Sequence, residues 1–131
     1  MKREPNSVKT MFLALLGSIT LLLVSSCGGG EPIPDLSPRA MVGREIAQGA
    51  GCFACHGGEG GGGVGPAWQG LAGATVELDD GTSVVADAAY LERSIVEPQA
   101  QVARGYTIVM PRVDLTSDEV SAIVTYIQEL K

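Results

Sequence analysis

The sequence is poor in histidine and cysteine. It contains a single histidine, His56, and three cysteines among 131 residues. A structural zinc site takes four nitrogen or sulfur ligands, commonly arranged as two pairs, and this chain holds barely enough such residues for one site. The scarcity disfavours a zinc site. Two of the cysteines and the histidine lie within five residues of one another, at positions 52–56.

Basic residues are also few, with nine Lys and Arg against 15 Asp and Glu and a formal net charge of −6. Removal of residues 1–26 would take away three basic side chains and one acidic side chain. An acidic surface argues against nucleic acid and anionic lipid as electrostatic partners. It favours a partner with a basic docking face, although acidity that only keeps a small domain soluble explains the charge equally well.

No apolar run is long enough for a comfortable membrane span, which needs about 20 residues. The run Met11–Val24 follows a basic N-terminus and has the length of the hydrophobic region of a signal peptide. The segment Val24-Ser25-Ser26-Cys27 comes next and resembles a bacterial lipobox, in which cleavage leaves a lipidated cysteine at the N-terminus. We therefore expect a lipoprotein signal peptide over residues 1–26. An ordinary cleavage site and an uncleaved N-terminal anchor are the alternatives, and both also export the domain.

Residues 27–37 are rich in glycine and proline, which disfavour regular structure. We expect a lipid anchor on Cys27, a flexible linker to residue 37 and a single domain over residues 38–131. The exported domain would face the periplasm or the cell exterior, held to the membrane by the lipid on Cys27. Lipidation would also leave no stray thiol to form a wrong disulfide.

The segment Cys52-Phe53-Ala54-Cys55-His56 reads C-x-x-C-H, the signature of covalent c-type haem attachment. The two thiols would add to the haem vinyl groups as thioethers, and His56 would be the proximal ligand of the iron. A thioredoxin-like pair needs a βαβ context, but no strand pattern precedes Cys52. A plain disulfide would leave His56 and the small hydrophobic core unexplained.

The second axial ligand cannot be another histidine, because the chain has only one. Met110 falls in a predicted loop next to Pro111, which stiffens the backbone, and a thioether suits low-spin haem iron. Met41 is the other methionine beyond residue 37, and it lies on a predicted helix where packing is the usual role. We therefore predict Met110 as the second ligand.

The stretch after the motif, Gly57–Pro66, is dominated by glycine. A G-x-G-x-x-G match within it does not indicate a dinucleotide site, because no strand leads into it. It is either a flexible loop or bare backbone that passes close to the haem. The Pro66 carbonyl could bind the second ring nitrogen of His56. Trp68 is expected in the pocket wall or core, with a hydrogen bond to a haem propionate as an alternative.

Local signals predict an all-α fold of three to four helices around one haem, with a short β-hairpin. The predicted helices are 38–48, 88–97 and one that opens with a capping box at Thr116–Glu119, and the hairpin spans 75–86. The apolar stripe predicted for the last helix is Val120, Ile123, Val124, Ile127 and Leu130. So small a core is marginal without a staple, and we expect the haem-free protein to be poorly folded.

Several segments together resemble the class I c-type cytochromes, in particular the cytochrome c domain fused to subunit II of some bacterial haem-copper oxidases. They are Gly51–Gly57, Gly65–Trp68, Leu78–Thr82, Tyr90–Ile95, Gly105–Tyr106 and Val109–Pro111. The resemblance implies a cytochrome c fold with thioethers at Cys52 and Cys55, axial ligands His56 and Met110, and the Pro66 carbonyl on the His56 ring. The chain lacks the copper domain, and one histidine could not supply a dinuclear copper site. It therefore resembles a free-standing, lipid-anchored carrier.

The resemblance implies a mono-haem, one-electron carrier rather than an enzyme, in a membrane-associated respiratory chain. Its implied partners are redox proteins such as a terminal oxidase or a quinol-oxidising complex. One alternative is a tethered electron-entry subunit of a larger oxidase or dehydrogenase complex. Another is a catalytic or gas-sensing haem, which needs an open iron position. Met110 argues against that alternative, and so does the lack of an acid–base pair.

Overall fold

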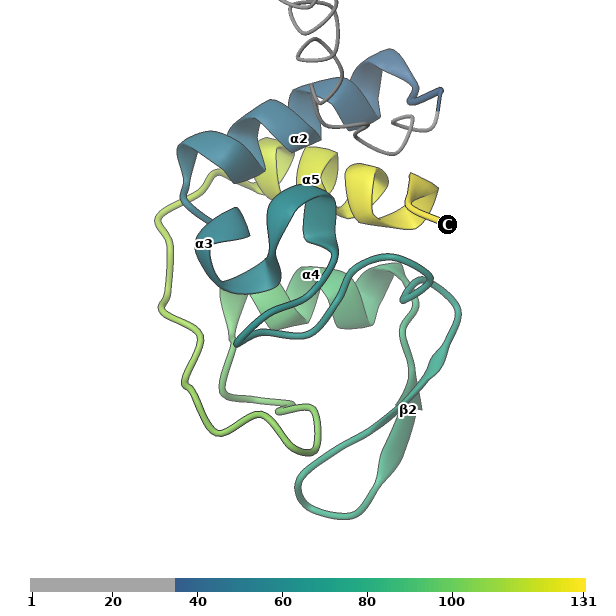
Figure 1. The fold of residues 1–131 in the computed structure, drawn as a ribbon, viewed down its shortest axis with the longest axis vertical. Helices are drawn as coiled ribbons and strands as arrows, with labels where there is room; N and C mark the ends of the chain where they lie inside the picture. The colour runs from purple at the N-terminus through teal and green to yellow at the C-terminus, as the bar shows by residue number, and fades with distance from the viewer. Residues whose placement is uncertain (1–34) are drawn as a thin grey trace, which may run out of the picture. The chain divides into compact units, whose positions relative to one another are not determined.

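The computed structural model describes residues 35–131, which form four α-helices, a short 3-10 helix and a two-stranded antiparallel sheet (Figure 1). The elements are α2 (Pro38–Gly49), α3 (Phe53–His56), η1 (Gly58–Gly60), β1 (Thr75–Glu77), β2 (Ser83–Val85), α4 (Ala88–Val96) and α5 (Ser117–Glu129). The helical fold with a short hairpin confirms the predicted fold class. The predicted signal peptide, the Cys27 lipidation site and most of the predicted linker lie outside the described residues.

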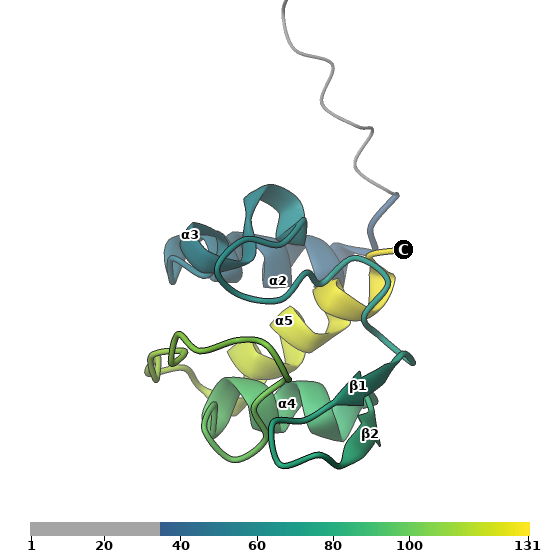
Figure 2. The ribbon, with the colours of Figure 1, turned by 60° about the horizontal axis from the view of Figure 1, so that its bottom comes forward.

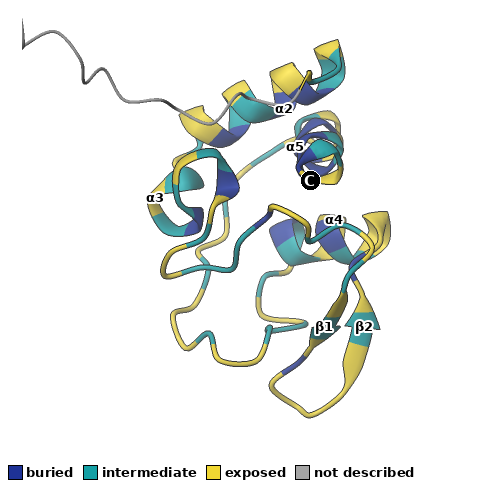
Figure 3. Cartoon of the chain, turned by 45° about the vertical axis from the view of Figure 1, so that its right-hand side comes forward, coloured by how far each residue is buried: buried dark blue, intermediate teal, exposed yellow. Residues whose placement is uncertain are grey.

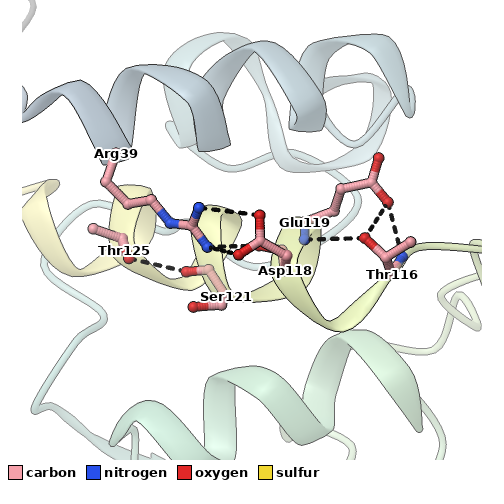
Figure 4. Close-up of polar contacts among 6 residues, drawn as sticks. All are labelled: Arg39, Thr116, Asp118, Glu119, Ser121 and Thr125. Carbon is pink, nitrogen blue, oxygen red and sulfur yellow. Dashed lines mark hydrogen bonds and ion pairs between the residues drawn. The ribbon is translucent and has the colours of Figure 1, made fainter.

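Side-chain caps begin the three longer helices where the sequence predicts. Ser37 caps α2 and Asp87 caps α4, each by accepting a hydrogen bond from the backbone N–H three positions later. Thr116 and Glu119 exchange the two reciprocal bonds of a capping box at the start of α5 (Figure 4). Caps of this kind stabilise a helix by about 0.5–2 kcal/mol each.

The helices of the described residues are short, and the longest of them, α5, has 13 residues. Within residues 35–131, none combines the length and the hydropathy that crossing a membrane requires.

Helix α3 was not predicted from the sequence. It is a single turn and too short to be stable alone. It continues from α2 through a hydrogen bond from Cys52 N to Ala47 O (3.0 Å).

Helices α2 and α5 cross in close contact (Figures 1 and 2). A Cβ atom on Gly43 would lie 2.0 Å from the backbone oxygen of Ala122, so only glycine permits this approach. The buried residues of α2 are Ala40, Gly43 and Ala47, all of them small. The prediction that Met41 packs in the core was wrong, because the contact face has no room for large side chains and Met41 is 54% exposed.

Helix α5 supplies the largest part of the core (Figure 3). The predicted apolar stripe is confirmed, since Val120, Ile123, Val124, Ile127 and Leu130 are all buried. Ala122 and Tyr126 are buried as well, so the buried face of α5 is wider than that stripe. Leu91 and Ile95 of α4 join the same cluster and close it from the other side.

The hairpin β1–β2 extends toward the long loop that leads from α4 to α5. Leu78 forms an antiparallel bridge with Ala103, and Asp79 N donates to Val102 O at 2.9 Å. These contacts hold the first part of the loop. The loop then continues without regular structure to α5, as the green-to-yellow trace shows (Figure 2).

Candidate haem-binding site

A cavity of about 570 Å³ lies among α3, α4, α5 and the loops that join them. Its volume is within the roughly 300–1,000 Å³ typical of small-molecule and cofactor sites. All six residues predicted for the haem site of the domain line this cavity: Cys52, Cys55, His56, Pro66, Trp68 and Met110. The fold therefore brings together residues that lie in three separate segments of the sequence.

His56 is 7% exposed, and its Nδ1 lies 2.8 Å from the carbonyl oxygen of Pro66. A carbonyl can only accept a hydrogen bond, so Nδ1 carries the hydrogen. This tautomer leaves the lone pair of Nε2 free for a metal, and the hydrogen bond fixes the ring and raises its basicity. The geometry suits His56 for the role of axial ligand.

The glycine-rich stretch presses its backbone against the His56 ring. A Cβ atom on Gly65 would lie 3.0 Å from Cε1 and 3.1 Å from Nδ1 of the imidazole. Gly65 N also donates to Cys55 O at 2.9 Å, which ties the stretch back to α3. The sequence leaves open whether this stretch is a flexible loop or bare backbone that passes close to the haem. Its backbone packs directly on His56, the predicted ligand, which favours the second alternative.

Cys52 and Cys55 are partly buried, and no disulfide joins them. Burial raises the pKa of the Cys52 thiol, whereas a reactive redox pair has a lowered thiol pKa. Among the described residues no strand precedes Cys52, so the βαβ context of a thioredoxin-like pair is missing from this part of the chain. Within residues 35–131, no three His, Cys, Asp or Glu side chains come close enough to hold a metal ion between them.

Trp68 belongs both to the cavity wall and to the core. It is 5% exposed and stacks on the His56 ring, with ring centroids 4.7 Å apart and an interplanar angle of 30°. Its other neighbours are Phe53 and Tyr126, at centroid distances of 5.6 and 6.1 Å. The tryptophan therefore links the imidazole to the centre of the core.

Met110 lines the cavity from the opposite loop and is partly buried. Its neighbours Ile108 and Val109 are 60% and 62% exposed. Among the described residues, no backbone hydrogen bond involves residues 107–115. This stretch is therefore held mainly at its two ends.

Several polar residues of the cavity wall were not predicted from the sequence. They are Gln99, Gln101 and Tyr106, from the loop after α4, and Asp79, from the hairpin. No lysine or arginine of residues 35–131 lines the cavity. The pairing of the hairpin with the loop places these residues, and nothing in the sequence signals that pairing.

The donor set fits haem c, because two thiols, an imidazole with a free Nε2 and a soft thioether surround one cavity. The family model described as Cytochrome c matches residues 40–131 of the sequence. The chain belongs to the cytochrome c family. It binds one haem c covalently, as members of this family do, and the haem supplies a one-electron redox couple for electron transfer. A search of curated proteins found no match.

Proposed function

We propose that this cytochrome c is a mono-haem, one-electron carrier. Cys52 and Cys55 would tether the haem, and His56 and Met110 would be its axial ligands. The observation that carries the proposal is that these four residues line one cavity, although Met110 comes from a distant segment. Two protein ligands leave no iron position for a substrate, which favours electron transfer over catalysis.

The residues around the proposed ligands favour a stable carrier. The Pro66 carbonyl orients the His56 ring by accepting a hydrogen bond from Nδ1, and Trp68 stacks on the ring. A methionine ligand raises the reduction potential relative to a second histidine. The chain thus supplies one rigidly held ligand, one soft ligand and a largely apolar pocket.

We further propose that the mature protein is a lipoprotein that serves a membrane-associated respiratory chain. Support comes from the lipobox-like segment before Cys27 and from the resemblance to an oxidase-linked cytochrome domain. Its partners would be redox proteins such as a terminal oxidase or a quinol-oxidising complex. Mass spectrometry of the N-terminal peptide tests the anchor, and Cys27→Ser is expected to release the protein from the membrane.

The second candidate function is a tethered electron-entry subunit of a larger oxidase or dehydrogenase complex, which the same resemblance favours. The two functions differ in how firmly the protein is held. Co-purification of a stable complex after mild detergent extraction would support the subunit, whereas release of the cytochrome alone at moderate salt would support the mobile carrier.

The experiment that tests the carrier is a visible and near-infrared spectrum of the matured protein, oxidised and reduced, with and without carbon monoxide. We expect a low-spin covalent haem, a sulfur-to-iron charge-transfer band and no carbon monoxide binding. Met110→Ala is the matched variant, expected to keep the covalent haem, lose the band and bind carbon monoxide. Ready carbon monoxide binding by the wild-type protein would instead indicate a catalytic or sensing haem.

A further inference from the structure

Glu59 is the one charged residue within the glycine-rich stretch after the haem motif. It is also the only non-glycine residue of the described chain with positive φ, at 54°. A side chain in this left-handed conformation is strained unless its surroundings hold it there. Glycine would adopt the conformation freely, so the glutamate side chain has to supply something that glycine cannot.

The Glu59 carboxylate joins two helices that flank the haem motif. Arg44 of α2 donates two hydrogen bonds to it, from Nε to Oε2 at 2.7 Å and from Nη2 to Oε1. The hydroxyl of Tyr126 on α5 donates to Oε2 at 3.1 Å. The contact with Arg44 lowers the pKa of Glu59, and burial, with a further contribution from Glu59, raises the pKa of Tyr126 to about 12. The carboxylate is therefore ionised and the phenol neutral near pH 7.

Tyr126 connects this cluster to the proposed iron ligand. Its side chain is fully buried and meets the Trp68 ring edge-on, at an interplanar angle of 88°. Trp68 in turn stacks on His56. The turn makes a second connection, because Gly60 accepts a hydrogen bond from Trp68 N at 2.8 Å and its backbone packs against the indole. Glu59 is thus connected to the His56 ring in two ways. Its side chain binds Tyr126, which packs on Trp68, and the adjacent Gly60 binds Trp68 through the backbone.

We propose that Glu59 is a positioning residue. By tying Arg44 and Tyr126 to the turn after the haem motif, it holds the Tyr126–Trp68 pair against His56 and fixes the orientation of the imidazole. The inference rests on the proposed function, in which His56 ligates the iron. It gives a role to a glutamate whose backbone conformation suits glycine.

A second ion pair on the same helices provides a matched control. Arg39 of α2 binds Asp118 of α5 through two nitrogens, with N–O distances of 2.6 and 3.2 Å (Figure 4). This pair also joins α2 to α5, but its side chains are 40% and 83% exposed, and the hydrogen bonds of Arg39 go to Asp118 rather than to the aromatic residues around His56. Asp118→Asn removes an interhelical ion pair without changing the stack.

The experiment compares Glu59→Gln, Tyr126→Phe and Asp118→Asn in the full-length matured protein. Glu59→Gln removes the charge and keeps the shape, while Tyr126→Phe keeps the packing and removes only the hydroxyl. The readouts are the electron paramagnetic resonance g values of the ferric haem, which report axial-ligand orientation, the reduction potential and the denaturant midpoint. We expect the g values to shift in Glu59→Gln and Tyr126→Phe and to stay at the wild-type values in Asp118→Asn.

We also expect Glu59→Gln to raise the reduction potential, because loss of a nearby negative charge disfavours the ferric state. Wild-type g values in both Glu59→Gln and Tyr126→Phe, with only a lower denaturant midpoint, would overturn the proposal and leave Glu59 a structural role alone. Should Glu59→Gln fail to fold, Tyr126→Phe decides the question. A wild-type haem that is not low-spin would overturn the proposed function itself, which separates the two failures.

Discussion

The two sides of the haem cavity are built differently. The His56 side, residues 52–68, folds back on itself through backbone hydrogen bonds, including Gly62 N to His56 O at 2.7 Å and Trp68 N to Gly60 O at 2.8 Å. The Met110 side, residues 105–115, has no such bond beyond residue 106 in the described structure. His56 and Trp68 are buried, whereas Ile108 and Val109 are mostly exposed.

This difference shows how one small domain can hold two ligands in two ways. Local stability follows buried apolar contacts and protected hydrogen bonds, and on this side such contacts orient His56. Residues 107–115 make no backbone hydrogen bond in the described structure, and the proposed sulfur–iron bond would complete the placement of Met110. We therefore expect changes on the His56 side to alter stability and changes on the Met110 side to alter ligation.

The largest expected effect comes from removing the haem, with Cys52→Ala and Cys55→Ala combined and any non-covalent haem extracted. Without the haem, the 570 Å³ cavity loses the group that fills it, and a core this small is marginal without such a staple. We expect loss of cooperative thermal unfolding, measured by circular dichroism. Hydrogen exchange should find residual protection on the His56 side and none over residues 107–115. Equal protection on both sides would contradict the comparison.

A smaller loss is expected for Gly65→Ala, which places a methyl group 3.0 Å from the His56 ring. Overpacking of this kind costs about 1–3 kcal/mol, and the backbone on the His56 side cannot move away without breaking its hydrogen bonds. Denaturant unfolding measures the loss. Gly49→Ala is the control, because its Cβ would meet nothing within 4 Å. Equal stability of the two variants would show that the His56 side is softer than the structure indicates.

The sequence predicted those parts of the fold that local signals determine. The capping residues Ser37, Asp87 and Thr116 mark where their helices begin, and the spacing of apolar residues predicts the buried stripe of α5. The motif C-x-x-C-H carries its chemistry within five residues. These features could be predicted because each depends on neighbours a few positions away.

The features that the sequence missed depend on distant contacts. Helix α3 is one turn, stabilised by what surrounds it, and Met41 is exposed because α5 approaches the small residues of α2. The bonds of Glu59 to Arg44 and Tyr126 span 15 and 67 positions. The only sign of this cluster in the sequence is a single glutamate among glycines. Nothing in the sequence indicates that Arg44 and Tyr126 are its partners.

The smallest expected effect is a loss of stability in acid. It should depend on Glu59, a charged residue of the His56 side of the cavity. Glu59 has a folded-state pKa below its ordinary value of 4.5, chiefly because Arg44 donates hydrogen bonds to it. Its contribution is therefore complete above pH 4.5 and is lost as the pH falls through the folded-state pKa. The loss is modest, because the ion pair is partly exposed and screened by salt.

Denaturant midpoints measured between pH 6 and pH 3 at low salt test this prediction. We expect Glu59→Gln to have a flatter pH dependence than the wild-type protein, because the amide does not titrate. Val109→Ser is the control from the Met110 side. It changes an exposed side chain that carries no charge, so it should keep the full acid dependence. If Glu59→Gln follows the wild-type curve as closely as Val109→Ser does, the ion pair adds nothing to stability. The rigidity of the His56 side would then come from packing and backbone hydrogen bonds alone.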